Sequence, residues 1–125
     1  MHSRNTLPSW QALTSHAKQM KQKHMNDFFA TNKHRFEQFS VNAPSLLLDY
    51  SKNLVTQETM QRLMALAQEC DVTTWREKMF NGERINSTEN RAVLHTALRC
   101  GLEQSITIDG ANVTEQVATS LDKMK

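Results

Sequence analysis

The side chains best suited to chemistry in this 125-residue sequence are concentrated in one stretch, residues 86–99. Its polar members include Glu89, Asn90, Arg91, His95 and Arg99. Arg91, His95 and Arg99 follow one another at i, i+4 spacing, which on a helix places them along one face. Three groups that can carry positive charge on one face indicate a phosphate or carboxylate site. The alternative, which we favour because Glu89 is a ready partner in the same stretch, is that these residues tie the segment to its neighbours through buried hydrogen bonds.

The favoured alternative gives Arg91 and His95 a structural role. Arginine is always charged, so a buried Arg91 needs carboxylate or carbonyl acceptors. Glu89 is near in the sequence, and Glu83 and Asp49 become candidates if the chain folds back. His95 is then expected to be neutral and hydrogen-bonded rather than a proton shuttle. On this basis Arg91→Ala should destabilise the fold by about 1–3 kcal/mol.

Metal, nucleotide and thiol chemistry find little support in the remaining residues. The five histidines are scattered, without the HxH or HExxH spacing of metal ligands: His2, His16, His24, His34 and His95. The three isolated glycines form neither of the familiar phosphate-binding loops. Cys100 follows His95 by five residues, so the two would not share a helix face. Cys70 and Cys100 are therefore predicted to be small apolar thiols.

Composition narrows the class of protein. The 15 Lys and Arg against 13 Asp and Glu leave a net charge of +2, which argues against a dedicated nucleic-acid binder. Hydrophobic residues make up 38% of the chain and charged residues 22%, which is lean for a self-sufficient core. No apolar run approaches the roughly 20 residues that cross a bilayer, and the N-terminus lacks the hydrophobic stretch of a signal peptide. We therefore expect a soluble, cytoplasmic protein with no nucleic-acid or membrane partner.

Two longer helices are predicted from apolar residues at helical spacing. The first covers residues 9–24 and has Pro8 in its first turn. Its expected buried stripe consists of Trp10, Leu13, Ala17 and Met20. The second is capped by Thr56 and ends near Glu69, before a break at Cys70 and Asp71. Its expected buried face consists of Met60, Leu63, Met64 and Ala67.

Between these helices the pattern predicts shorter elements. A short helix is expected with Asn26 as its cap and Phe28 and Phe29 as apolar anchors. A further turn over residues 33–38 would bury Phe36. These elements lead into the first of two predicted hairpins.

Turn residues between short apolar runs predict both β-hairpins. The first pairs residues 39–41 with residues 46–51 across the turn signal of residues 42–45. The second pairs residues 105–108 with residues 111–113 across Asp109 and Gly110. The predicted fold class is therefore α+β, mostly helical with two short β-hairpins.

Three further helices are predicted after residue 71. One covers residues 72–80, with Val72, Trp75 and Met79 turned inward and Asn81 and Gly82 as its stop. Another begins with Ser87 as its cap and runs through residues 91–99. The last is capped by Thr114 and runs to Lys125 without a stop signal. Its expected apolar face consists of Val117, Leu121 and Met124.

Residues 79–99 also carry a family resemblance. This stretch, which ends in ENRAVLHTALR, resembles the N-terminal signature of the glucose-6-phosphate isomerase (phosphoglucose isomerase) family. The LDYSKN of residues 48–53, the WQAL of residues 10–13, Arg35–Phe36 and the Asp109–Gly110 hairpin fit the same pattern in order. The pattern is lost at residues 100–104, where the family continues with an Asn-Arg-Ser type stretch.

The resemblance implies a sugar isomerase of several hundred residues. Full-length members interconvert glucose 6-phosphate and fructose 6-phosphate, in glycolysis and gluconeogenesis. A glutamate moves a proton between adjacent carbons through an enediol, a histidine and a lysine assist ring opening, and Ser/Thr-rich loops bind the phosphate. No metal or organic cofactor is used, and members are typically homodimers with a larger α/β/α sandwich.

For this chain the resemblance implies the N-terminal part of such an enzyme, with residues 1–125 as one unit that is not a complete autonomous domain. The family's catalytic and phosphate-binding motifs lie C-terminal to the matched region. Thus no catalytic, substrate-binding or metal residue is assigned here, and Glu89 and His95 are not the family's catalytic glutamate and histidine. The chain alone is predicted to be inactive. The alternative is an autonomous small α+β module that binds a protein partner or an acidic ligand; the final helix, which has no stop signal, favours the fragment.

Overall fold

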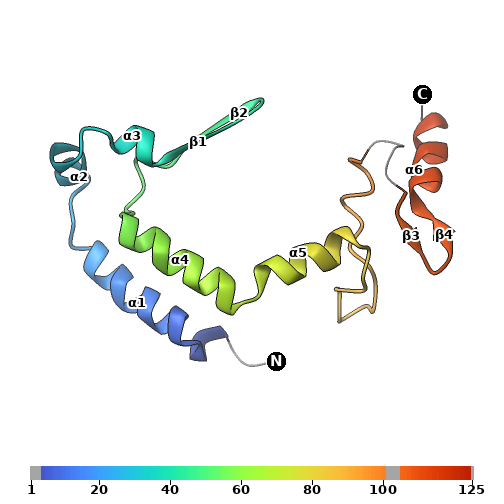
Figure 1. Cartoon of the computed structure of the whole chain (residues 1–125), viewed down its shortest axis with the longest axis horizontal. Coiled ribbons are helices and arrows are strands. Elements are labelled where there is room, and N and C mark those ends of the chain that lie inside the picture. The colour runs from blue at the N-terminus through green and yellow to red at the C-terminus, as the bar shows by residue number, and fades with distance from the viewer. Residues whose placement is uncertain (1–3, 101–104, 125) are drawn as a thin grey trace. The chain divides into compact units, whose positions relative to one another are not determined.

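Six α-helices and two pairs of short antiparallel strands make up the described part of the chain, residues 4–100 and 105–124 of a computed structural model (Figure 1). The contacts divide the chain into two compact units, Met1–Cys70 and Asp71–Lys125. The predicted mixed α+β class with two short hairpins is confirmed, and about half of the chain is helical.

The first unit holds a short 3-10 helix and four α-helices: η1 (Arg4–Thr6), α1 (Pro8–Met20), α2 (Met25–Thr31), α3 (Arg35–Gln38) and α4 (Gln57–Glu69). Helix α1 begins at Pro8, because a missing N–H does no harm in the first turn. It ends four residues earlier than predicted. The cap of α2 is His24, so the prediction of Asn26 was wrong.

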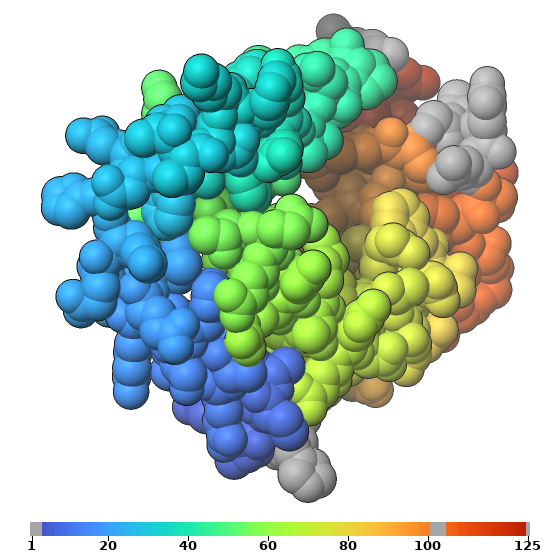
Figure 2. Space-filling model, turned by 60° about the vertical axis from the view of Figure 1, so that its left-hand side comes forward, coloured from blue at the N-terminus to red at the C-terminus, as the bar shows by residue number. Residues whose placement is uncertain are grey.

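Helices α1 and α4 pack against each other, as Figures 1 and 2 show for the blue and green segments. The buried positions of α1 are His16 and Met20, one turn apart. Trp10 and Ala17 are exposed, so the predicted stripe was wrong at these two positions. At about 100° per residue both lie roughly 100–120° around the helix from His16. Trp10 and Ala17 fit the helical spacing of the predicted apolar stripe, but α1 contacts α4 through a different face.

The face that α4 turns toward α1 is likewise rotated from the prediction. Thr59 is buried, whereas Leu63 is 39% and Met64 59% exposed. Met64 lies about 140° around the helix from Thr59. The predicted N-terminus is confirmed: Thr56 is the cap and the helix starts at Gln57.

The first hairpin joins β1 (Ser40–Ala43) to β2 (Leu46–Asp49), in the register Ser40↔Asp49 to Ala43↔Leu46. The predicted hairpin is confirmed. At its base Phe39 is 3% exposed and meets the Tyr50 ring edge-on, with 5.8 Å between centroids. Phe36 is 47% exposed, so the prediction that it would be buried was wrong. Phe39 takes the inward position instead.

The second unit holds α5 (Val72–Phe80), β3 (Thr107–Ile108), β4 (Ala111–Asn112) and α6 (Val113–Asp122). The predicted limits of α5 and its stop at Asn81 are confirmed. Its predicted inward face was wrong at Val72 and Trp75, which are exposed, whereas Met79 is half-buried. Gly82 is buried with φ +72°, and a Cβ there would lie 3.1 Å from Ile108 Cδ1. Both the backbone conformation and the close approach of Ile108 favour glycine.

Residues 86–99 do not form the predicted helix. Asn86 and Arg91 instead pair as an isolated antiparallel bridge, with N···O distances of 3.0 and 3.2 Å. The Asn86 side chain accepts from the Thr88 hydroxyl at 2.7 Å and from the Glu89 N–H at 3.3 Å, which closes the turn between the two bridge residues. Asn90 adopts φ +49°. Ser87 therefore lies in a turn and caps no helix, because local bonds to Asn86 compete with helix formation.

The second hairpin is confirmed, with Asp109 and Gly110 both at positive φ in its turn. The cap of α6 is Asn112, whose side chain accepts from the Glu115 N–H at 3.3 Å. Thr114 is buried and accepts from the Ile106 N–H at 3.1 Å, so its predicted role as the cap was wrong.

The end of α6 differs from the prediction as well. The helix ends at Asp122, Leu121 is 44% exposed and Met124 76% exposed. Lys125 and residues 101–104, where the family pattern is lost, lie outside the described residues. Within the described part of the chain, no helix combines the length and apolar character that a membrane span requires.

Candidate functional site

The polar stretch of residues 86–99 does not gather its cationic groups on one face. Without a helix, the i, i+4 relation between Arg91, His95 and Arg99 has no geometric consequence. The Arg91 side chain is 72% exposed and forms an ion pair with Glu89. The predicted partner is thus confirmed and the predicted burial was wrong. His95 is exposed, and its carbonyl accepts from Arg99 Nη1 at 3.3 Å.

Arg84, which the sequence did not single out, links this region to the second hairpin. Its Nη2 donates to Asp109 Oδ2 at 2.6 Å, and its Nη1 to the Asn90 carbonyl at 3.3 Å. Arg84, Arg91 and Asp109 help to line a shallow cleft of about 430 Å³. Both arginines already face a carboxylate, so the cleft offers little net positive charge to an anion. The ion pair of Arg84 with Asp109 spans 25 residues and leaves no local sequence signal.

We therefore expect Arg91→Ala to change the free energy of unfolding by less than about 1 kcal/mol, because an exposed ion pair contributes little. This replaces the 1–3 kcal/mol that burial would imply. Urea unfolding followed by circular dichroism measures the change. A loss of more than 2 kcal/mol would show that Arg91 is buried after all.

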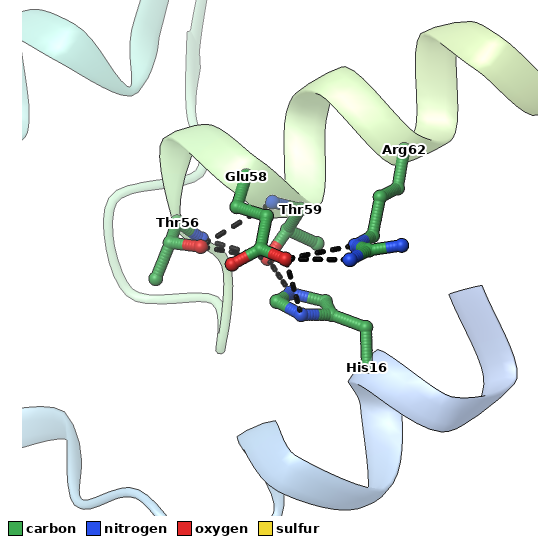
Figure 3. A network of polar contacts seen from close by, with 5 residues as sticks. All are labelled: His16, Thr56, Glu58, Thr59 and Arg62. Atoms are coloured by element: carbon green, nitrogen blue, oxygen red, sulfur yellow. Dashed lines mark hydrogen bonds and ion pairs between the residues drawn. The ribbon is translucent and has the colours of Figure 1, made fainter. Parts of the chain in front are cut away.

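A second polar cluster lies where α1 meets α4 (Figure 3). His16 Nε2 is 2.7 Å from the hydroxyl of Thr59, and both residues are buried. Thr59 in turn accepts from the Thr56 N–H at 3.0 Å, while its own N–H donates to Thr56 Oγ1 at 3.3 Å, which completes a capping box. The Thr59 hydroxyl thus contacts both the N-cap residue of α4, Thr56, and the α1 residue His16.

Glu58 adds an acid to this cluster. Its Oε1 lies 3.7 Å from His16 Nδ1 and accepts from Arg62 Nη2 at 2.7 Å. The order carboxylate, imidazole, hydroxyl is that of a nucleophile-activating triad. Here, however, the hydroxyl of Thr59 is buried between two helices and already accepts a backbone N–H. The arrangement therefore serves to hold α1 to α4, as expected of a hydrogen-bonded histidine.

The Glu58 carboxylate should make stability depend on pH. The hydrogen bond from Arg62, and then the charges of Arg62 and His16, lower the pKa of Glu58. A lowered pKa in the folded state gives stability that is present above the unfolded pKa of about 4.3 and is lost as the pH falls through the folded pKa. Glu58→Gln should therefore be less stable than the parent chain at pH 7, and this difference in stability should diminish as the pH falls through the folded pKa. In the Arg62→Gln background this pH-dependent difference should shrink; an unchanged difference would contradict the assignment.

A third cluster surrounds the guanidinium of Arg35, which is only 2% exposed. It donates to three carbonyls of the segment that leaves β2: Ser51 at 2.7 Å, Asn53 at 2.9 Å and Val55 at 3.0 Å. It also lies over three aromatic rings, those of Phe28, Phe29 and Phe39. Arg35 therefore holds the loop between β2 and α4 to the helices before the hairpin.

The same loop is shaped by Asp49, whose Oδ1 accepts from the Ser51 N–H at 2.8 Å. Hydrogen bonds from Ser51 lower the pKa of this carboxyl group. Asp49 and Arg35 thus both hold the backbone of Ser51: Asp49 binds its N–H and Arg35 binds its carbonyl. The sequence placed both in family motifs without indicating this role.

In all three clusters, polar side chains bind one another or the backbone. The exception in the second cluster is His16 Nδ1, which is buried without a hydrogen-bond partner and has Glu58 Oε1 at 3.7 Å. No set of three His, Cys, Asp or Glu side chains among the described residues is placed to hold a metal ion.

Comparison with known proteins defines the class. A family model described as phosphoglucose isomerase matches residues 49–125. The glucose-6-phosphate isomerase of Pseudoalteromonas translucida is 54% identical over 125 residues, which is 100% of this chain and 23% of the relative. The glucose-6-phosphate isomerase 1 of Colwellia psychrerythraea is 52% identical over 125 residues, which is again 100% of this chain and 23% of the relative. That of Methylococcus capsulatus is 47% identical over 119 residues, 95% of this chain and 22% of the relative.

The chain belongs to the phosphoglucose isomerase family. It spans about a quarter of the length of the curated relatives it matches, and it corresponds to the N-terminal portion of their sequence. The resemblance drawn from residues 48–53 and 79–99 is thereby confirmed.

Proposed function

We propose that the chain is the N-terminal portion of an enzyme that interconverts glucose 6-phosphate and fructose 6-phosphate. The observation that carries the proposal is the 54% identity to a glucose-6-phosphate isomerase over all 125 residues. We further propose that the complete enzyme acts in the cytoplasm as a homodimer, and that it is completed by a larger α/β/α sandwich. The sugar phosphate is then a partner of the complete enzyme alone, with no nucleic-acid or membrane partner.

Within that enzyme we assign these 125 residues a scaffold role, with no catalytic, substrate-binding or metal residue. The exposure of large apolar side chains supports this role. Trp10, Phe36, Leu46, Phe80 and Leu98 are all more than a third exposed. The buried hydrophobic side chains among the described residues are Met20, Phe39 and Ala97, which is a small core for a chain of this length. We propose that residues 1–125 form one piece of a domain that the remaining chain completes.

The chain alone is expected to have no isomerase activity. Isomerisation needs a positioned base for the carbon proton and a cradle for the phosphate. Here Glu89 is paired with Arg91, and Arg84 is paired with Asp109. A coupled assay that detects glucose 6-phosphate formed from fructose 6-phosphate measures this, with the full-length Pseudoalteromonas translucida enzyme as the positive control. Turnover well above the blank that disappears in Glu89→Gln would show that the active site lies in this chain.

The alternative function, a small module that binds an acidic ligand, gains no support from the charges. Arg84 and Arg91 are the cations that line the cleft of the second unit, and each is paired with a carboxylate. Binding of inorganic phosphate or an acidic peptide at micromolar concentration would revive this alternative. We expect neither in a titration calorimetry experiment.

A further inference from the structure

The β1–β2 hairpin has one apolar face and one polar face. In an antiparallel pair, directly opposed residues point to the same side and successive residues to opposite sides. The pairs Val41↔Leu48 and Ala43↔Leu46 therefore share one face. The pairs Ser40↔Asp49 and Asn42↔Leu47 share the other. We call the side formed by Val41, Ala43, Leu46 and Leu48 the apolar hairpin face.

Within the first unit, no described residue covers the apolar hairpin face. Val41 is 53% exposed, Leu46 65% and Leu48 56%. Figure 1 shows the hairpin extending from the end of α3 beyond the helices of its own unit. A two-stranded ribbon is marginally stable in water unless its apolar face packs on another layer. The face therefore requires an occupant with an uncharged, apolar surface.

We propose that the apolar hairpin face is a docking surface for the part of the isomerase chain that its relatives carry beyond the matched region. The inference rests on the proposed function. The relatives are more than four times as long as this chain, since 125 residues make up 23% of their length. Most of the family's polypeptide is thus available to supply the missing layer in the same molecule.

A second copy of this chain fits the face less well. Four residues at about 3.4 Å each, on two strands that are each about 4.8 Å wide, give a footprint of about 130 Å². A stable protein–protein interface needs about 800 Å² per partner. A segment of the same polypeptide has no such requirement, because its attachment already provides a high effective concentration.

The polar face supplies a matched control within the same strand. Leu47 is 52% exposed, close to the 56% of Leu48, but it points to the side of Ser40, Asn42 and Asp49. Asp49 on that side is already bonded to the Ser51 N–H. Docking of the apolar face should therefore protect position 48 and leave position 47 accessible.

The test compares thiol labelling at the two positions. Leu48→Cys and Leu47→Cys are made with Cys70 and Cys100 replaced by serine, both in the 125-residue chain and in a full-length enzyme. The full-length enzyme is the Pseudoalteromonas translucida isomerase with its matched region replaced by this chain. In the short chain, both thiols should react with a maleimide at similar rates. In the full-length enzyme, the Leu48→Cys variant should react at least ten-fold more slowly than the Leu47→Cys variant.

Equal labelling of the two positions in the full-length enzyme would overturn the proposal. Slow labelling of position 48 in the short chain, appearing only as its concentration rises, would overturn it in favour of a second copy. Ten-fold protection of position 48 in a chimera that lacks isomerase activity would uphold the docking surface and count against the proposed function. Different results would therefore overturn the docking surface and the proposed isomerase function.

Discussion

Replacing Arg35 with alanine should destabilise the first unit by about 3–5 kcal/mol, the largest effect we expect of any single substitution in the chain. The guanidinium is 2% exposed and is the donor for three carbonyls. Removing it leaves the carbonyls of Ser51, Asn53 and Val55 without this partner. It also removes the contacts with the faces of three phenylalanine rings. Burial lowers the pKa of Arg35, but an arginine still remains charged at neutral pH.

Urea unfolding monitored at 222 nm measures the effect. Arg35→Lys should recover only part of the loss, because one ammonium group on a flexible stem cannot reproduce the planar fork that reaches three carbonyls. Arg76→Ala is the matched control: its side chain is 60% exposed and lies 3.8 Å from Glu77, so its loss should be within about 0.5 kcal/mol. An Arg35→Ala chain as stable as Arg76→Ala would show that the three carbonyls find water instead.

His16→Ala should be the next most damaging change, with a loss of about 2–4 kcal/mol. The imidazole is 4% exposed and fills the contact between α1 and α4. Its removal leaves a cavity there and takes away the 2.7 Å contact with the Thr59 hydroxyl. Since Thr59 also belongs to the capping box of α4, the start of that helix should loosen too.

Thermal unfolding measures the loss of stability, and hydrogen exchange of the Thr59 amide measures the loosening at the start of α4. The control is His34→Ala, because the His34 side chain is 75% exposed and pairs with Glu37 three residues away. That change should cost no more than about 0.5 kcal/mol. If His16→Ala and His34→Ala unfold at the same temperature, the packing of α1 on α4 does not depend on the imidazole.

Local sequence signals correctly predicted those features whose backbone conformation depends on a few neighbouring residues. Pro8 at the start of α1, Thr56 at the start of α4 and the stop after α5 at Asn81 all lie where they were predicted. The Asp109–Gly110 turn follows the same rule, because positive φ at both residues is favoured by these residue types. Each of these features depends on two to four neighbouring residues.

The choice of which side chains are buried could not be predicted in this way. Apolar spacing placed Trp10 and Met64 inside, but each lies more than 100° around its helix from the buried position that meets the opposite helix. The helix predicted over residues 91–99 failed for a related reason. The Asn86 side chain and the bridge to Arg91 satisfy the backbone there in another way.

The sequence by itself determined the family, the two hairpins and the starts of α1, α4 and α5, since each depends on a short run of residues. Only the tertiary structure decided the roles of His16 and Arg35. His16 is 43 residues from Thr59, and Arg35 is 16 to 20 residues from its three carbonyls. Local periodicity holds no information about which distant groups meet. A histidine or an arginine becomes a buried anchor only when the folded chain brings its acceptors within hydrogen-bonding distance and excludes water from around them.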